Sequence, residues 1–142
     1  MSSAQKAILV SISSDIGFDM AKRWLAYGWS IYGTYRTYTN RLEELSNQGA
    51  ILKYCDLSDI ASIEHCCQEL KIACPEWDTL VLCPGVTTPI GPFQTTNFGE
   101  WADSININFT HQLQIIHALL QFRNRNHALG PCMLTFAGGG TN

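Results

Sequence analysis

Residues 7–24 of this 142-residue chain read AILVSISSDIGFDMAKRW, and the expected fold follows from this stretch. Ala7–Ile12 is a short apolar run rich in β-branched residues, which suits a buried parallel strand. A turn follows at Ser13–Gly17, and apolar residues then recur at helical spacing up to the helix stop Gly28: Ile16, Met20, Trp24 and Tyr27. Free N–H groups and the helix dipole converge where such a strand enters a helix. The segment predicts a nucleotide-binding turn or, alternatively, an ordinary strand–helix turn of an α/β protein.

The composition is that of a single well-buried domain. Hydrophobic residues make up 46% of the chain and charged residues 15%, which excludes a disordered protein. The net charge of −3 gives no reason to expect nucleic acid or an anionic membrane as a partner. No apolar run approaches the roughly 20 residues of a membrane span, and the N-terminus does not resemble a signal peptide. We therefore expect a cytoplasmic protein.

The cysteines do not have the spacing of a metal site. They form no Cys-x-x-Cys pair and have no partnered histidines at metal spacing, so we expect no bound metal. We interpret all six as buried free thiols that act as small hydrophobic side chains: Cys55, Cys66, Cys67, Cys74, Cys83 and Cys132.

Strand-like runs alternate with helical patterns along the chain. Strands are predicted at Ala7–Ile12, Ser30–Tyr35, Ile51–Tyr54, Thr79–Cys83 and Cys132–Phe136. Capping residues and apolar periodicity predict helices that begin near Asn40, near Ser58 or Asp59, and near Trp101. The last helix is long and carries apolar residues on one face: Trp101, Ile105, Phe109, Leu113, Ile116 and Leu120. This alternation predicts an α/β fold of βαβ units with right-handed crossovers, in which helices cover both faces of a parallel sheet.

Ligands of such sheets bind at the carboxyl ends of the strands, so the residues that follow each strand are candidates. Arg36 follows the second strand, where arginine favours a 2′-phosphate, unless it is only a solvated loop residue. Asp56 follows the third, where it can accept from an adenine amino group or merely help to start a helix. Cys83-Pro84-Gly85 ends the fourth, and its glycine allows close approach of a ligand. Asn106 and Asn108 are unfavourable inside a helix, so we expect one to make a specific hydrogen bond.

Taken together, these residues and their positions after the strands resemble the pattern of the short-chain dehydrogenase/reductase family, in its non-extended branch. The resemblance covers nearly the whole chain. The family's pyrophosphate-binding T-G-x-x-x-G-x-G turn has its counterpart in Val10–Gly17, although only the last glycine is kept. Asp56-Leu57 matches the adenine-contacting D-[VL] pair. Leu82–Gly85 takes the place of N-[NS]-A-G, and Ile107–Phe109 matches the V-N-x helix motif.

The resemblance implies a Rossmann-type NAD(P)-binding domain over residues 1–142, with a doubly wound parallel sheet in strand order 3-2-1-4-5. The implied cofactor-binding residues are Ser11, Ser13, Ser14, Asp15, Ile16, Gly17, Arg36, Asp56, Leu57, Cys83, Pro84 and Gly85. Arg36 makes NADP the expected cofactor, with NAD less favoured. Asp15 would repel a pyrophosphate unless its side chain turns away to cap the helix.

The catalytic residues of the family are largely missing from this sequence. Asn108 corresponds to the asparagine of the family's catalytic tetrad. The two candidate serine positions after the fifth strand hold Ala137 and Gly138, which leaves Thr141 as the nearest hydroxyl and candidate substitute. No tyrosine has a lysine four residues later, and the family's Tyr-x-x-x-Lys pair would lie beyond Asn142. We therefore interpret the chain as the truncated, cofactor-binding part of a longer protein.

The predicted function is that of an NADP-dependent oxidoreductase, which transfers a hydride between nicotinamide and a carbonyl/alcohol carbon. The alternative is a catalytically degenerate nucleotide-binding or scaffold protein with the same fold; a sugar-nucleotide epimerase or dehydratase is disfavoured by the turn spacing. The expected partners are a small-molecule carbonyl or alcohol substrate and further copies of the chain in a homodimer or homotetramer. The family counterpart of the long helix commonly packs against a symmetry mate, which predicts His111, Gln114 and His117 near the partner.

Overall fold

Five parallel strands form one sheet at the centre of the molecule. In the computed structural model, which describes residues 3–136, their order is β3-β2-β1-β4-β5. Every neighbouring pair is parallel. This arrangement confirms the predicted strand order. The strands are β1 (Lys6–Val10), β2 (Ser30–Tyr35), β3 (Ile51–Tyr54), β4 (Thr79–Leu82) and β5 (Cys132–Thr135).

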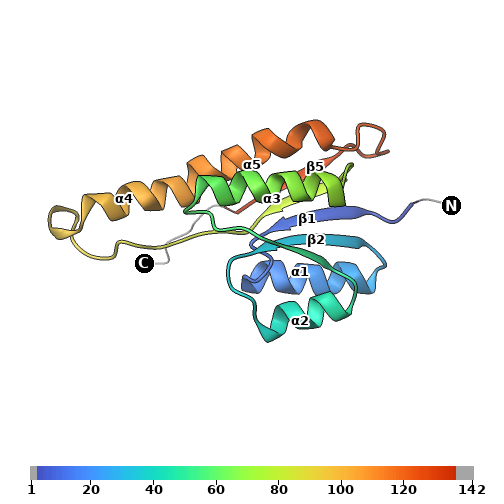
Figure 1. Cartoon of the computed structure of the whole chain (residues 1–142), viewed down its shortest axis with the longest axis horizontal. Coiled ribbons are helices and arrows are strands. Elements are labelled where there is room, and N and C mark those ends of the chain that lie inside the picture. Colours follow the sequence, from blue (N-terminus) through green and yellow to red (C-terminus); the bar gives the residue numbers. More distant parts are fainter. Residues whose placement is uncertain (1–2, 137–142) are drawn as a thin grey trace.

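Helices cover both faces of this sheet (Figure 1). Helices α1 and α2 lie on one face, and α3 and α5 lie on the other, while α4 continues the line of α5 beyond the sheet. The helices are α1 (Asp15–Ala26), α2 (Asn40–Asn47), α3 (Ile60–Ala73), α4 (Phe98–Ile105) and α5 (His111–Leu119), with shorter turns η1 (Phe93–Thr95), η2 (Asn106–Thr110) and η3 (Leu120–Phe122). None of these helices in residues 3–136 is long and apolar enough to span a membrane.

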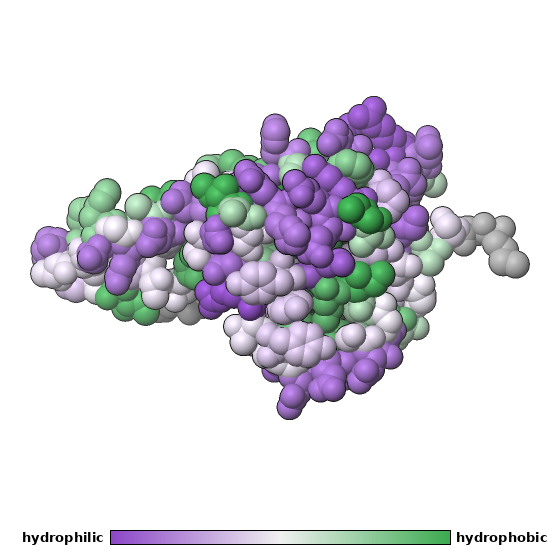
Figure 2. Space-filling view, in the orientation of Figure 1, coloured by the Kyte–Doolittle hydropathy of each residue, from purple (hydrophilic) through white to green (hydrophobic). Residues whose placement is uncertain are grey.

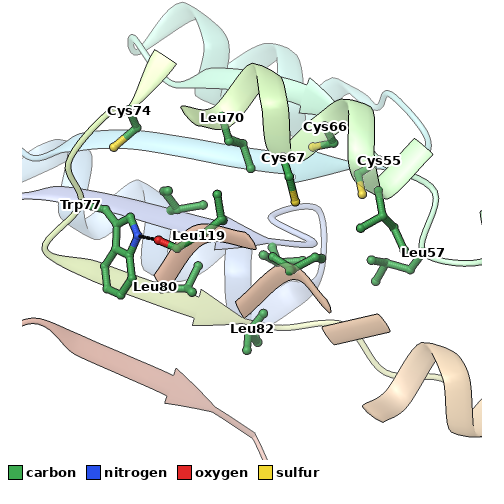
Figure 3. Close-up of a cluster of buried hydrophobic side chains, with 14 residues drawn as sticks. Cys55, Leu57, Cys66, Cys67, Leu70, Cys74, Trp77, Leu80, Leu82 and Leu119 are labelled. Carbon is green, nitrogen blue, oxygen red and sulfur yellow. Dashed lines mark hydrogen bonds between the residues drawn. The ribbon is translucent and has the colours of Figure 1, made fainter. Parts of the chain in front are cut away.

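The sheet divides the hydrophobic core into two layers because side chains alternate along each strand. On β1, Ile8 and Val10 belong to the layer beneath α3 and α5, whereas Ala7 and Leu9 belong to the layer beneath α1 and α2. Figure 3 shows the first layer, in which buried Trp77 donates from Nε1 to the carbonyl oxygen of Leu119 at 2.8 Å. This hydrogen bond satisfies the one polar atom of the indole inside the core.

The first strand and helix differ in detail from the sequence prediction. Strand β1 ends at Val10 because the next residue, Ser11, turns the chain with a φ of 59°. Helix α1 stops as predicted at a glycine of positive φ, Gly28. Its buried residues, however, are Gly17 and Ala21. The predicted apolar face of this helix is therefore wrong at its first and last residues, Ile16 and Tyr27, which are exposed. Small residues face the sheet because α1 lies very close to it.

The predicted long helix is not one regular helix. It is interrupted by the π turn η2, in which the N–H of His111 donates to the carbonyl oxygen of Asn106, five residues earlier. One extra residue in a turn rotates the following helix by about 100°. As a result α5 buries His111, Ile115 and Leu119, and Leu113 and Leu120 of the predicted apolar face are exposed instead. Ile105 at the end of α4 and Phe109 within η2 are exposed as well.

The prediction that all the cysteines are buried is correct for four of them. Cys55, Cys66, Cys67 and Cys74 are buried, and Cys83 is half-buried. Cys132 is exposed, which contradicts the prediction. The reason is its position on β5, whose residues are all exposed and which, within residues 3–136, pairs with β4 alone.

Candidate functional site

A cavity of about 390 Å³ opens at the carboxyl end of the sheet, around the ends of β1, β2, β3 and β4. It is the place where the predicted ligand should bind, because the strand order reverses beside β1. Most of the predicted cofactor-binding residues line it: Ser11, Ser13, Ser14, Arg36, Asp56, Leu57, Cys83, Pro84 and Gly85.

The turn between β1 and α1 is held by two side-chain hydrogen bonds. The N–H of Ser11 donates to Oγ1 of Thr34 at 2.9 Å, which fixes the turn against β2. Oγ of Ser14 accepts from the N–H of Gly17 at 3.0 Å and caps the helix. The first N–H groups of a helix have no acceptor within it, and together with the dipole they favour an anion. The turn therefore fits a phosphate group.

Gly17 allows this turn to sit tightly against the strand. A Cβ built on Gly17 would lie 2.9 Å from the carbonyl oxygen of Ser11 and 3.0 Å from Cα of Ile12. A side chain at this position would therefore push α1 away from β1 and open the turn. This is the glycine that the sequence retains from the motif.

The Asp15 carboxylate does not point at the anion site. Its Oδ1 accepts from Nη1 of Arg41 at 2.6 Å, so the side chain turns outward and is neutralised by α2. The helix cap is Ser14 and not Asp15. Asp15, Ile16 and Gly17 do not line the cavity, so any contact that they make with a cofactor stays a prediction.

Charged and hydroxyl groups meet at the ends of β2 and β3. Oδ1 of Asp56 accepts from the N–H of Ser58 at 2.9 Å and from its Oγ at 2.7 Å. These bonds lower the pKa of the Asp56 carboxyl against the opposing effect of burial, and the nearby charge of Arg36 makes a smaller contribution in the same direction as the bonds. The carboxylate is therefore a hydrogen-bond acceptor at neutral pH. Sequence reasoning missed three hydroxyl-bearing residues that also line this end, although they lie close in sequence to Arg36 or Asp56: Thr37, Thr39 and Ser58.

The loop that follows β4 is anchored to η2 by side-chain amides. Asn108 accepts from the N–H of Val86 at 2.8 Å through Oδ1 and donates from Nδ2 to the Val86 carbonyl at 2.9 Å. Gln112 donates from Nε2 to the carbonyl oxygens of Pro84 and Ile107, at 3.2 and 3.1 Å. The expectation that one of the two helix asparagines makes a specific hydrogen bond is met by Asn108. Gln112 was missed, and its signal would have been its position one helical turn after Asn108.

Cys83 replaces an asparagine of the family pattern at the end of β4. Burial raises the pKa of its thiol to about 11, against the opposing effect of a hydrogen bond with Ser14. The thiol is therefore protonated at neutral pH.

His111 lies inside the protein rather than at a surface for a partner. It is buried, and its Nδ1 is hydrogen-bonded with the carbonyl oxygen of Leu57, which lines the cavity. The prediction that His111 lies near a partner subunit is therefore wrong. Instead it joins α5 to the loop that carries Asp56.

Thr141, Ala137 and Gly138 lie outside the described residues.

The sequence model of one family, described as short chain dehydrogenase, matches residues 5–128 of this chain. The chain belongs to this family. Its members are oxidoreductases that use NAD(P). A comparison with curated proteins found no match.

Solved structures of short-chain dehydrogenases share the fold of this family member. A short-chain dehydrogenase from Streptomyces avermitilis has a TM-score of 0.80 at 23% identity, over 94% of this chain and 49% of its own. The short-chain dehydrogenase/reductase from Serratia marcescens has a TM-score of 0.76 at 19% identity, over 84% and 51%. A blue fluorescent protein from a metagenomic library, in complex with NADPH, has a TM-score of 0.78 at 21% identity, over 92% and 54%. The chain thus spans about half the length of these relatives.

Proposed function

We propose that this chain is the NADP-binding part of a short-chain oxidoreductase that interconverts a small carbonyl compound and its alcohol. The observation that carries the proposal is the cavity at the carboxyl end of the sheet, where the α1 N-terminus, Arg36 and Asp56 meet. NADP, when bound, supplies the hydride or accepts it. The protein's contribution is to bind and orient the cofactor and the substrate.

Each part of the cavity has a proposed role. The turn Ser11–Ser14 and the first N–H groups of α1 would hold the pyrophosphate. Arg36 would bind the 2′-phosphate through charge-assisted hydrogen bonds, and Asp56 would accept from the adenine amino group. The backbone of Cys83–Gly85 would border the nicotinamide end. Asn108 stays our candidate for the proton relay, and Thr141 our candidate substitute for the catalytic serine. Because the Asn108 amide is hydrogen-bonded to the Val86 backbone, Asn108 also positions the cavity wall.

The test of this assignment is the preference between the two cofactors. Arg36→Asp should weaken NADPH binding to the chain by about 2 kcal/mol, about 30-fold, while NADH binding changes far less. Fluorescence titration with both nucleotides measures this. The matched control is Arg125→Asp. Arg125 is exposed and lies two residues after Arg123, which pairs with Trp77 at the end of the sheet opposite to the cavity. Equal losses for NADPH and NADH in the Arg36 variant would contradict a 2′-phosphate site.

The second candidate function is nucleotide binding without catalysis. It is favoured by the glycines lost at Ser11 and Asp15, the asparagines lost at Leu82 and Cys83, and the serine lost at Ala137 and Gly138. Steady-state turnover by a longer protein that contains this chain and a Tyr-x-x-x-Lys segment distinguishes the two functions. Only the oxidoreductase would oxidise NADPH in the presence of aldehydes or ketones.

We further propose a cytoplasmic homodimer or homotetramer. Support for association comes from the exposed apolar residues of α4, η2 and α5, among them Ile105, Phe109 and Leu113. Hydrophobic colouring in Figure 2 appears on the part of the molecule formed by α4 and the neighbouring loop. With His111 turned inward, we propose this apolar face as the contact with a second copy.

A further inference from the structure

A buried histidine is hydrogen-bonded to the part of the cavity wall that follows β3. His111 is the first residue of α5, and its exposed fraction is 8%. Its Nδ1 is hydrogen-bonded with the carbonyl oxygen of Leu57, which lies 54 residues earlier in the chain. Leu57 lines the cavity together with its neighbours Asp56 and Ser58. The contact therefore connects α5 to the backbone of the loop that we assign to the adenine.

The chemistry of the two atoms decides the direction of this hydrogen bond. A backbone carbonyl oxygen can only accept, so Nδ1 of His111 carries a proton and donates it. Leu57 is itself buried, with an exposed fraction of 8%. A buried carbonyl oxygen is unfavourable without a donor. The hydrogen bond therefore holds the loop and the imidazole together.

The same loop is held from a second helix. The N–H of Asp56 donates to Oγ of Ser62, on α3, at 2.8 Å. Figure 3 shows Leu57 at the opposite end of the core layer from Trp77, where this layer meets the loop. Consecutive residues of the cavity wall are thus fixed by different helices, Asp56 by α3 and Leu57 by α5.

The π turn η2 places His111 in this position. The N–H of His111 donates to the carbonyl oxygen of Asn106, five residues earlier. Without the extra residue of the turn, the side chain would be rotated by about 100° on the helix surface. Within the same turn, Asn108 is hydrogen-bonded to the backbone of Val86 in the loop after β4. One irregular turn therefore anchors the cavity wall on two sides, after β3 and after β4.

We propose that His111 is a positioning residue of the nucleotide site, which holds the Leu57 carbonyl and thereby keeps the Asp56 carboxylate in place to accept from the adenine amino group. This role rests on the proposed function. Adenine is common to NADPH, NADH and AMP, so loss of the His111 hydrogen bond should weaken the binding of all three. Loss of Arg36, in contrast, should act mainly on NADPH, because only this nucleotide carries the 2′-phosphate.

The experiment compares variants of the chain by fluorescence titration with NADPH and NADH and by displacement with AMP. His111→Leu removes the donor and keeps an apolar side chain, and each affinity should fall by about tenfold, or about 1.4 kcal/mol. His111→Asn should keep each affinity within about threefold of the wild type, because Nδ2 of asparagine can take the place of Nδ1. The matched control is Ile115→Val on the next turn of α5, where the side chain is buried in the same core layer. It loses packing but should leave all three affinities unchanged.

Two measurements without nucleotide test the contact itself. Nitrogen-15 NMR of the wild-type chain should show that Nδ1 of His111 is protonated. Hydrogen exchange at the Asp56 amide should be faster in His111→Leu than in His111→Asn. The reference is the amide of Ile12, which donates to the carbonyl oxygen of Thr34 at 3.0 Å and should exchange equally in all variants.

Each result has a distinct meaning for the two proposals. A wild-type chain that binds the nucleotides, with unchanged binding by His111→Leu, would overturn the role of His111 and leave the proposed function intact. An unprotonated Nδ1 would also overturn this role, and so would equal losses in the leucine, asparagine and Ile115 variants, since packing alone would explain them. A wild-type chain that binds none of the three nucleotides would contradict the proposed function, and the NMR measurements would then decide whether His111 holds the loop. If His111→Leu fails to fold, the wild-type protonation state and the asparagine variant still decide.

Discussion

Ser11 occupies the left-handed backbone region, with a φ of 59°, at the turn that faces the cavity. A side chain in this region costs about 1–2 kcal/mol, and glycine avoids that cost while losing about 0.5–1 kcal/mol through its freedom in the unfolded chain. Ser11→Gly should therefore raise the free energy of unfolding by up to about 1 kcal/mol, measured by urea denaturation. Ser11→Ala is the control, since it keeps Cβ and the strain. A glycine variant less stable than the alanine variant would contradict this account.

The hydrogen bonds between Asp56 and Ser58 affect both the pKa of the Asp56 carboxyl and the stability of the folded chain. Because the pKa of Asp56 in the folded chain is lowered from 3.8, its contribution is fully present above that pH. It is lost as the pH falls through the folded-state pKa. Ser58→Ala removes the Oγ donor and should raise the pKa of Asp56 toward 3.8, as followed by NMR titration of the carboxyl carbon. Ser104→Ala, a serine whose Oγ accepts from Asn108, should leave this pKa unchanged. An identical Asp56 titration in the Ser58 variant would exclude the hydroxyl as the cause.

Among the secondary-structure elements, η2 determines how the loop after β4 is held. Asn108 makes two hydrogen bonds to the backbone of Val86, at 2.8 and 2.9 Å. Asn108→Ala should lower the free energy of unfolding by about 1–2 kcal/mol and accelerate hydrogen exchange at the Val86 amide. Asn106→Ala, in the same π turn, should change neither. Slow exchange at Val86 in the Asn108 variant would show that the loop is held by other contacts.

The exposed apolar face of α4, η2 and α5 is the element on which association should depend. Phe109 is 62% exposed and Leu113 is 47% exposed. Burial of such side chains between two copies is favourable at about 25 cal/mol per Å². We expect Phe109→Glu to dissociate the oligomer of the longer protein, as measured by sedimentation velocity. Asn47→Glu, an exposed change on α2 at the opposite face of the sheet (Figure 1), is the control. A wild-type protein that is monomeric at high micromolar concentration would contradict the proposed assembly.

For the molecule as a whole, we expect the 142-residue chain to have no turnover of its own. Proton transfer to a carbonyl oxygen needs a positioned acid, whose loss removes about 10²–10⁴-fold of the rate. The sequence contains no tyrosine with a lysine four residues later. NADPH oxidation with a panel of aldehydes, ketones and keto-sugars should therefore remain at background. Robust turnover would show that Thr141, a histidine or another group of this chain supplies the proton.

The architecture could be predicted because it is encoded in local patterns. Apolar strands and capped helices alternate, and right-handed crossovers then leave few arrangements of the sheet. The carboxyl ends of parallel strands meet at one edge, so Arg36, Asp56 and Cys83 could be assigned to a common cavity from their positions alone. The match of residues 5–128 to the family model agrees with the predicted family.

Contacts between distant residues could not be predicted in the same way, because they depend on the packing of one element against another. The outward turn of Asp15 needs Arg41 on α2, and the inward position of His111 follows from the rotation at η2. Periodicity thus specified which strands and helices form and at which edge the site lies. The direction in which each polar side chain points was set by three-dimensional packing, since partners far apart in sequence leave no local pattern.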